Sequence, residues 1–108
     1  MEKNGLAGST SLLVLSLLRD GDKYGYEMIA QLALRSEGVF ELKEGTLYPV
    51  LKKLENGGYV TSYEAEANGR TRKYYRITKS GLKQLAEEKE SWEVYASGVN
   101  SVLSFMPG

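Results

Sequence analysis

The sequence contains neither cysteine nor histidine in its 108 residues. Without cysteine there is no disulfide framework and no thiolate chemistry, and without histidine the commonest general base and metal ligand is missing. Hydrolytic and metal-dependent mechanisms therefore lose their usual side chains. We expect no catalytic residue, no metal and no cofactor.

Long apolar runs are also missing. The most apolar stretch, residues 12–18, is interrupted by Ser16 and ends at Arg19, which is far too short to cross a bilayer. Glu2 beside Lys3, with no small-residue cleavage site after the apolar run, does not fit a secretory signal. The hydrophobic fraction of 42% and the charged fraction of 26% are ordinary for a globular chain. We therefore expect one folded, cytoplasmic domain.

The formal net charge is zero, because fourteen basic and fourteen acidic side chains cancel. Since nucleic-acid-binding domains tend to be basic, this balance alone argues against a polyanionic partner. The distribution argues otherwise. Residues 43–79 hold eight basic and four acidic side chains, whereas residues 1–42 hold four and six, and residues 80–108 hold two and four. From Gly69 to Lys79 there are five basic side chains and no acidic one, so the positive field is local.

Two helices are predicted in the first third of the chain. The apolar run after the polar stretch 8–11 ends at Gly21 and has so little polar surface that it should be buried nearly all round. Residues 23–38 follow, with apolar side chains at helical spacing and Gly38 at the end.

A third helix is predicted from a segment that begins near Glu44. Its apolar side chains fall at positions i, i+3, i+4 and i+7 counted from Leu47. Because Pro49 is tolerated only near a helix start, the helix should begin properly at Thr46 or Leu47 and end at Gly57. The opposite face carries Thr46, Pro49, Lys52 and Lys53, with Tyr48 at the border.

After this helix the apolar period changes from 3.6 to 2, and two stretches rich in β-branched and aromatic residues flank Asn68-Gly69. This pair is the strongest short hairpin signal. We call the predicted hairpin the wing; its basic part runs from Gly69 to Arg76. With Asn68 and Gly69 as the turn, the facing pairs are Tyr63 with Tyr74, Glu64 with Lys73, and Val60 with Ile77.

A long final helix is predicted from Lys79 to about Met106, capped by Thr78. Alternating steps of three and four from Leu82 visit eight positions, of which all but Lys89 are apolar. We call this stripe the seam. One small domain has no means of covering it, so we expect a second copy to do so. The predicted dimer interface is Leu82, Leu85, Trp92, Ala96, Val99 and Leu103.

The order of three helices, a hairpin and a final helix is that of a winged helix-turn-helix, a mainly α fold with a small β-hairpin. We assign residues 1–78 to a DNA-binding domain and residues 79–108 to a C-terminal dimerisation helix, together one compact unit. In this fold the third helix, the recognition helix, enters the major groove while other elements hold phosphates. Two surface lysines on that helix would be unremarkable alone. Arg70, Arg72 and Lys73, however, concentrate charge on a projecting hairpin, for which an anionic groove is the natural partner.

Three strings of this sequence resemble the PadR-like family of transcriptional regulators. They are KYGYEMI, EGTLYPVLKKLENGGYV and GRTRKYYRITKSGLKQL, and together they span most of the chain. The single C-terminal helix is similar to that of the family's smaller subgroup. The resemblance implies a homodimer that binds a palindromic double-stranded operator, usually as a repressor that releases DNA when a small molecule binds.

The resemblance and the charge pattern together select a set of DNA-binding residues. Tyr24, at the start of the second helix, belongs to it because helix N-termini favour phosphate. Tyr48 is equally well explained as a packing residue, and Pro49 shapes the helix start more than it contacts DNA. The predicted set is Tyr24, Thr46, Tyr48, Pro49, Lys52, Lys53, Arg70, Arg72 and Lys73.

Trp92 is the only tryptophan, and it lies on the seam. Multidrug-responsive members of the family are similar, with paired tryptophans around a flat aromatic compound between subunits. This implies an effector site at Trp92, with Leu12 and Ser16 of the first helix as further walls. Alternatively, Trp92 only fills the dimer core, because aromatic side chains dominate interface burial. The sequence leaves both interpretations open.

Two other classes of function are compatible with parts of this sequence. Winged helices also serve as protein-interaction modules without specific DNA binding, and the unopposed charge from Gly69 to Lys79 argues against that alternative. An enzyme is the third class. Glu64 and Glu66 share one strand face, but no nucleophile, ligand set or phosphate loop lies nearby in the sequence, so exposed strand carboxylates explain them better.

Overall fold

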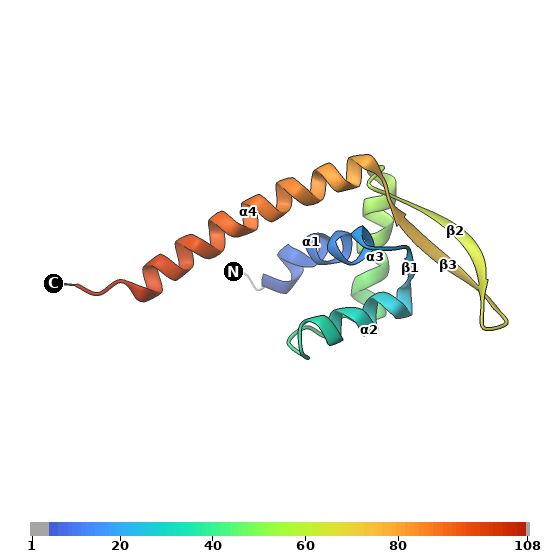
Figure 1. Ribbon diagram of the computed structural model, residues 1–108, viewed down its shortest axis with the longest axis horizontal. Helices are drawn as coiled ribbons and strands as arrows, with labels where there is room; N and C mark the ends of the chain where they lie inside the picture. The colour runs from blue at the N-terminus through green and yellow to red at the C-terminus, as the bar shows by residue number, and fades with distance from the viewer. Residues whose placement is uncertain (1–4, 108) are drawn as a thin grey trace.

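The computed structural model describes residues 5–107, with side chains from residue 9 onward. The elements are α1 (Gly5–Arg19), β1 (Lys23–Tyr24), α2 (Gly25–Arg35), α3 (Glu44–Asn56), β2 (Val60–Ala67), β3 (Arg70–Ile77) and α4 (Lys79–Ser104). The predicted winged helix-turn-helix with a long C-terminal helix is confirmed (Figure 1). Glu2 and Lys3, used above to judge the start of the chain, lie outside the described residues. Within residues 5–107, no helix has both the length and the apolar character needed to cross a bilayer.

The core lies where α1, α2, α3 and the base of the sheet meet. Val14 and Leu15 of α1, Met28 of α2, and Leu47 and Leu51 of α3 are completely buried. Apolar residues recur along each helix at the spacing that places them on its inner face. Burial of this apolar surface is what holds the three helices together.

Helix α1 differs from the expectation in two ways. It begins at Gly5, so the polar stretch 8–11 lies inside the helix and does not cap it. Within the helix, the Ser11 hydroxyl donates a 3.3 Å hydrogen bond to Glu88 of α4, so a tertiary contact accommodates this polar side chain. Burial also stops short of the whole circumference, because Leu12 and Ser16 remain half-buried.

Helix α3 begins at Glu44, so the prediction of a start at Thr46 or Leu47 was wrong, and Pro49 lies inside the helix. The amide nitrogens of Thr46 and Leu47 already bond to the Lys43 carbonyl, at 3.0 and 2.8 Å. Proline removes only the bond that residue 49 would donate to the carbonyl of Gly45. Since Gly45 is exposed, water can satisfy that carbonyl.

The wing has the predicted register, with Tyr63 opposite Tyr74, Glu64 opposite Lys73, and Val60 opposite Ile77. Asn68 and Gly69 both adopt positive φ angles, 55° and 78°, as a tight two-residue turn requires. The sheet has a further strand that the sequence did not reveal: β1 pairs with β3, which gives the order β1-β3-β2. Tyr24 therefore lies in a strand and is the N-cap of α2, not the first residue of its helix.

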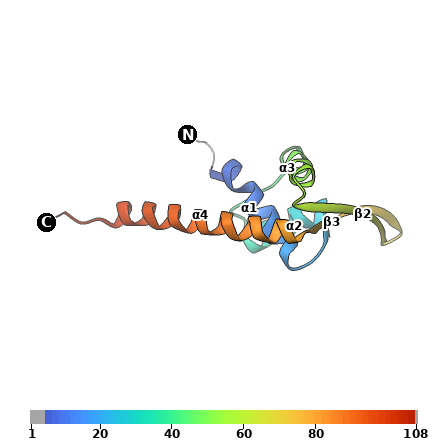
Figure 2. The same cartoon turned by 90° about the horizontal axis from the view of Figure 1, so that it is seen from above.

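Helix α4 begins as predicted, since the Thr78 hydroxyl accepts a 3.0 Å hydrogen bond from the amide of Gly81. It ends at Ser104, which leaves Met106 outside the helix. Its first turns pack beside α1, and its second half projects away from the core (Figure 1). The wing and the end of α4 consequently lie at opposite ends of a molecule measuring 64 × 28 × 24 Å (Figure 2).

Candidate DNA-binding surface and dimer surface

The outward face of α3 is the one the sequence predicts. Leu47, Leu51 and Leu54 are buried. Thr46, Pro49, Lys52 and Lys53 are exposed on the other side of the helix. Their hydroxyl and ammonium groups are therefore free to approach base edges or phosphates, the contacts expected of a recognition helix.

Tyr48 is partly packed, which supports the packing role, and it also keeps exposed surface, so its contact with DNA stays a prediction. Its side chain is 43% exposed, but its hydroxyl lies against Gly25, where any larger residue would collide with the ring. Burial raises the pKa of Tyr48, and the nearby Glu44 carboxylate raises it further. The phenol therefore stays protonated and can donate a hydrogen bond.

Four of the predicted DNA-binding residues meet in one surface hollow of about 400 Å³ between α2, α3 and the wing. They are Tyr24, Tyr48, Arg72 and Lys73; the hollow is also lined by Gly25, Tyr26, Glu44 and Thr71. The guanidinium of Arg72 lies 4.5 Å from the centre of the Tyr24 ring. Thr46, Pro49, Lys52, Lys53 and Arg70 do not line this hollow.

The two faces of the wing differ in charge. Arg70 and Arg72 lie opposite Ala67 and Ala65, so no carboxylate faces them across the strand pair. Lys73 points to the other face of the sheet and lies opposite Glu64. The unopposed positive charge is therefore carried by arginines on one face. The count of charges along the sequence did not separate the two faces of the wing.

Asp22, which the sequence analysis missed, binds the wing from the loop between α1 and β1. Its carboxylate accepts hydrogen bonds from the Tyr63 hydroxyl at 2.6 Å and from Nε of Arg76 at 3.0 Å. Partial burial raises the pKa of Asp22, but these hydrogen bonds and the charge of Arg76 outweigh it, so the pKa is lowered overall. Since the partners lie 41 and 54 residues away, no local pattern signals this contact.

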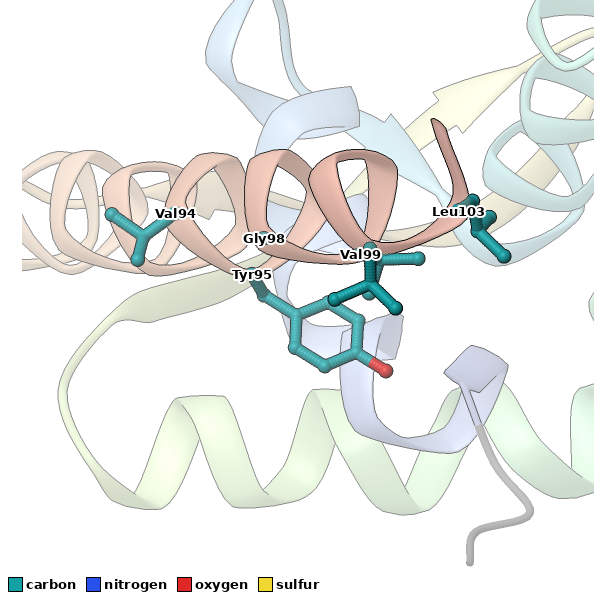
Figure 3. A pocket seen from close by; sticks show the side chains of 6 residues that line it. Val94, Tyr95, Gly98, Val99 and Leu103 are labelled. Atoms are coloured by element: carbon teal, nitrogen blue, oxygen red, sulfur yellow. The ribbon is translucent and has the colours of Figure 1, made fainter. Parts of the chain in front are cut away.

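The second half of α4 carries a second surface, an apolar groove of about 450 Å³. Its lining residues are Val94, Tyr95, Gly98, Val99, Val102 and Leu103. Figure 3 shows Tyr95 and Val99 projecting from the same side of the helix.

The predicted seam agrees with this groove only in part. Val99 and Leu103 belong to both, and Leu82, Trp92 and Ala96 are at least partly exposed. Leu85 is only 4% exposed, because it packs into the core of its own chain and has no surface left for a partner. Tyr95 and Val102 were missed, although their separation of seven residues is the signal that could have found them.

The residues of the predicted effector site lie on two helices. Trp92 is 46% exposed, and its ring lies 5.7 Å from that of Tyr95. Leu12 and Ser16 are half-buried on α1. A hydrogen bond between these two helices joins Ser11 of α1 to Glu88 of α4.

An exposed recognition helix beside an arginine-bearing wing places this protein in the class of winged-helix transcriptional regulators. Residues 14–87 match the transcriptional regulator PadR-like family. The chain belongs to this family and is a DNA-binding transcriptional regulator, not an enzyme.

Known relatives agree with this assignment. The chain is 31% identical over 88 residues to a transcriptional regulator of Mycobacterium tuberculosis, covering 82% of this chain and 79% of that protein. It is similar to the structure of a transcriptional regulator from Clostridium thermocellum, with a TM-score of 0.85 at 35% identity over 92% of this chain and 97% of that one. A PadR family regulator from Eggerthella lenta has a TM-score of 0.78 at 35% identity, covering 92% and 85% of the two chains.

Proposed function

We propose that the protein is a homodimeric repressor that binds a palindromic operator and releases it when a small-molecule effector binds. The observation that carries the proposal is the uncovered apolar half of α4, joined in one chain to an exposed recognition helix and wing. A second copy of the chain would cover the apolar half of α4. The resulting dimer would present two recognition helices and two wings to one duplex.

The dimer is supported by the chemistry of residues 92–107, in which Glu93 is the one charged side chain. Val94, Val102 and Leu103 are 70%, 76% and 77% exposed. A contiguous apolar surface of this kind is typical of an interaction site, and a two-fold dimer covers the same patch on both copies. A second α4 is the occupant that matches it in length and composition.

Specific DNA binding is supported by the position of α3 and the wing. In proteins of this architecture the recognition helix contacts base edges, and dimers bind half-sites about one helical turn apart. Arg70 and Arg72 supply charge without an opposing carboxylate, which suits them to the phosphate backbone or to a narrow minor groove. Two wings and two recognition helices related by a two-fold axis would match a palindrome.

The effector site is proposed between the subunits. Trp92 and Tyr95 present two neighbouring aromatic rings on the helix that a partner would cover, and aromatic rings favour stacking with flat aromatic compounds. Leu12 and Ser16 are half-buried on α1, so we propose that a partner's α4 brings them together with Trp92. A ligand at this place would change the spacing of the two recognition helices if it favours one arrangement of the dimer.

Operator binding is tested by fluorescence anisotropy, with the palindrome from the upstream region of the protein's own gene and a scrambled sequence of equal composition. Wild type should prefer the palindrome and lose affinity steeply with salt. The Arg70→Ala/Arg72→Ala variant should lose this binding. Arg19→Ala/Lys83→Ala removes the same charge from exposed positions outside the wing and the seam and serves as the control.

Equal affinity of the wild type for both DNAs would remove the specific-repressor proposal. Unchanged binding by the wing variant would favour the protein-interaction alternative. Repression is tested with a reporter gene placed behind the same upstream region.

The effector proposal has its own measurement. Planar aromatic cations should quench the fluorescence of Trp92 and lower operator affinity together. Absence of quenching across a varied panel would leave Trp92 as a packing residue of the interface.

A further inference from the structure

Asp22 connects the loop between α1 and β1 to both strands of the wing. In addition to its hydrogen bonds from Tyr63 and Nε of Arg76, its carboxylate forms an ion pair with Nη2 of Arg76 at 2.9 Å. The Asp22 side chain is 25% exposed, so solvent screens the pair less than it would at an open surface. One carboxylate thus holds a residue of β2 and a residue of β3.

The contacts continue along one face of the wing toward its arginines. The Arg76 guanidinium lies 5.1 Å from the centre of the Tyr63 ring. Tyr63 stacks on Tyr74 with ring centres 5.7 Å apart and planes inclined by 14°. Tyr74 meets Tyr24 edge to face at 5.4 Å, and Tyr24 lies under Arg72. Because ring and cation–π contacts prefer particular geometries, each group restricts the next.

The other attachments of the wing to the helices are concentrated near its base, where the Ser62 hydroxyl of β2 donates a 2.7 Å hydrogen bond to Glu55 of α3. β1 pairs with β3 only at Tyr74 and Tyr75, and the wing's side chains in the core are Val60, Tyr75 and partly Ile77, all near its base. The remainder projects away from the helices (Figure 1). A long two-stranded hairpin is only marginally stable by itself, so its direction depends on what holds its base.

We propose that Asp22 is a positioning residue for DNA binding, which fixes the arginine face of the wing relative to α3 by holding Tyr63 and Arg76. This inference rests on the proposed operator binding. Asp22 does not contact DNA in this role, and it also withdraws Arg76 from the charges available to phosphate. It acts through the orientation of Arg70 and Arg72.

Removal of the Asp22 carboxylate should change operator affinity in the direction opposite to that expected from charge alone. Removing a carboxylate beside a DNA-binding surface should strengthen binding if charge alone mattered, because phosphate repulsion falls. If Asp22 positions the wing, its removal should weaken binding. We expect Asp22→Ala to lower operator affinity roughly tenfold, the size of a typical coupling within one contact network.

Asp20→Ala is the matched control. Asp20 carries the same charge two positions away, but it pairs with Arg35 at 2.9 Å and Lys23 at 3.6 Å and has no contact with the wing among its described interactions. This control should bind the operator as tightly as the wild type or more tightly. Asp22→Asn, which keeps the shape of the side chain, should show a smaller loss and guards against misfolding of the alanine variant.

A double-mutant cycle separates positioning from a general folding defect. In the Arg70→Ala/Arg72→Ala background, measured at low salt where residual binding is detectable, Asp22→Ala should cause no further loss. An equal loss in both backgrounds would overturn the positioning role, as would wild-type or tighter binding by Asp22→Ala. If the wild type itself binds no operator, the proposed function fails, and this inference fails with it.

Discussion

The packed body of the protein and the second half of α4 use apolar residues in opposite ways. In the body, Val14, Leu47 and Leu51 are completely buried. Beyond Trp92, Val102 and Leu103 keep more than three quarters of their surface exposed. Each square ångström of buried apolar surface contributes about 25 cal/mol, and the body gains this energy within one chain, whereas the end of α4 gains it only against another molecule. In the proposed dimer, folding and assembly would therefore depend on different ends of one chain.

The largest expected effect comes from placing a charge in the α4 groove. Val99→Asp should dissociate the dimer and lower affinity for the full palindrome about 100-fold or more, because two linked half-site contacts become independent. Analytical ultracentrifugation and anisotropy measure the two effects, and circular dichroism should show an unchanged helix content.

Ser97→Asp is the control, since residue 97 lies on the opposite side of the helix. If both variants remain dimeric, the groove is not the dimer interface.

The second prediction concerns the body. Leu47→Ala should lower the free energy of unfolding by about 2–5 kcal/mol, because it leaves a cavity in the core. Urea unfolding in the Val99→Asp background measures this without the contribution of dimerisation. Leu103→Ala in the same background should change the free energy of unfolding by less than about 0.5 kcal/mol, as is usual for exposed positions. A similar cost for both would contradict the division between the two regions.

The third prediction compares two cations of the wing. Arg70→Ala should weaken operator binding more than Lys73→Ala, because Lys73 faces Glu64 while Arg70 faces Ala67. Loss of one phosphate contact should also reduce the slope of log affinity against log salt concentration by about 1. Anisotropy titrations at several salt concentrations measure both quantities. A larger effect of Lys73→Ala would place the DNA on the other face of the wing.

The smallest effect is expected from pH. The hydrogen bond from Arg35 lowers the pKa of Asp20, and the contacts with Tyr63 and Arg76 lower that of Asp22, both from a usual value of 3.8. A lowered carboxyl pKa stabilises the fold above the usual value, and this stabilisation is lost as the pH falls through the folded-state pKa. With no histidine to titrate, the contribution of these two groups to the urea midpoint should stay constant from pH 8 to 5.

The comparison that isolates Asp22 is the difference in urea midpoint between wild type and Asp22→Asn. This difference should shrink below about pH 4, where the Asp22 carboxylate of the unfolded chain begins to bind a proton, and should be lost as the pH falls through the lowered pKa of the folded state. A difference that persists undiminished at pH 2 would show that the charge of Asp22 does not stabilise the fold.

Local signals in the sequence were sufficient to predict the features that depend on near neighbours. Asn68-Gly69 predicted the turn and register of the wing, and Thr78 predicted the start of α4. The spacing of apolar residues from Leu47 predicted the inner and outer faces of α3. These signals are strong because a turn, a cap or a helix face is formed by residues within a few positions of one another. The family strings lie on the same elements, which is why the class of the protein was also predictable.

Other features depend on contacts between segments that are distant in the sequence, and local signals did not reveal them. The two-residue strand at Tyr24 is too short to show the apolar alternation of a strand. Asp22 meets Arg76 only because the wing lies beside the loop after α1. The Ser11 hydroxyl is satisfied within α1 because α4 lies beside that helix and supplies the Glu88 carboxylate. Leu85 and Tyr95 are both apolar residues of α4, but the chain's own core covers the first and leaves the second exposed. Periodicity identifies an apolar face, but which part of that face remains for a partner depends on where the rest of the chain packs.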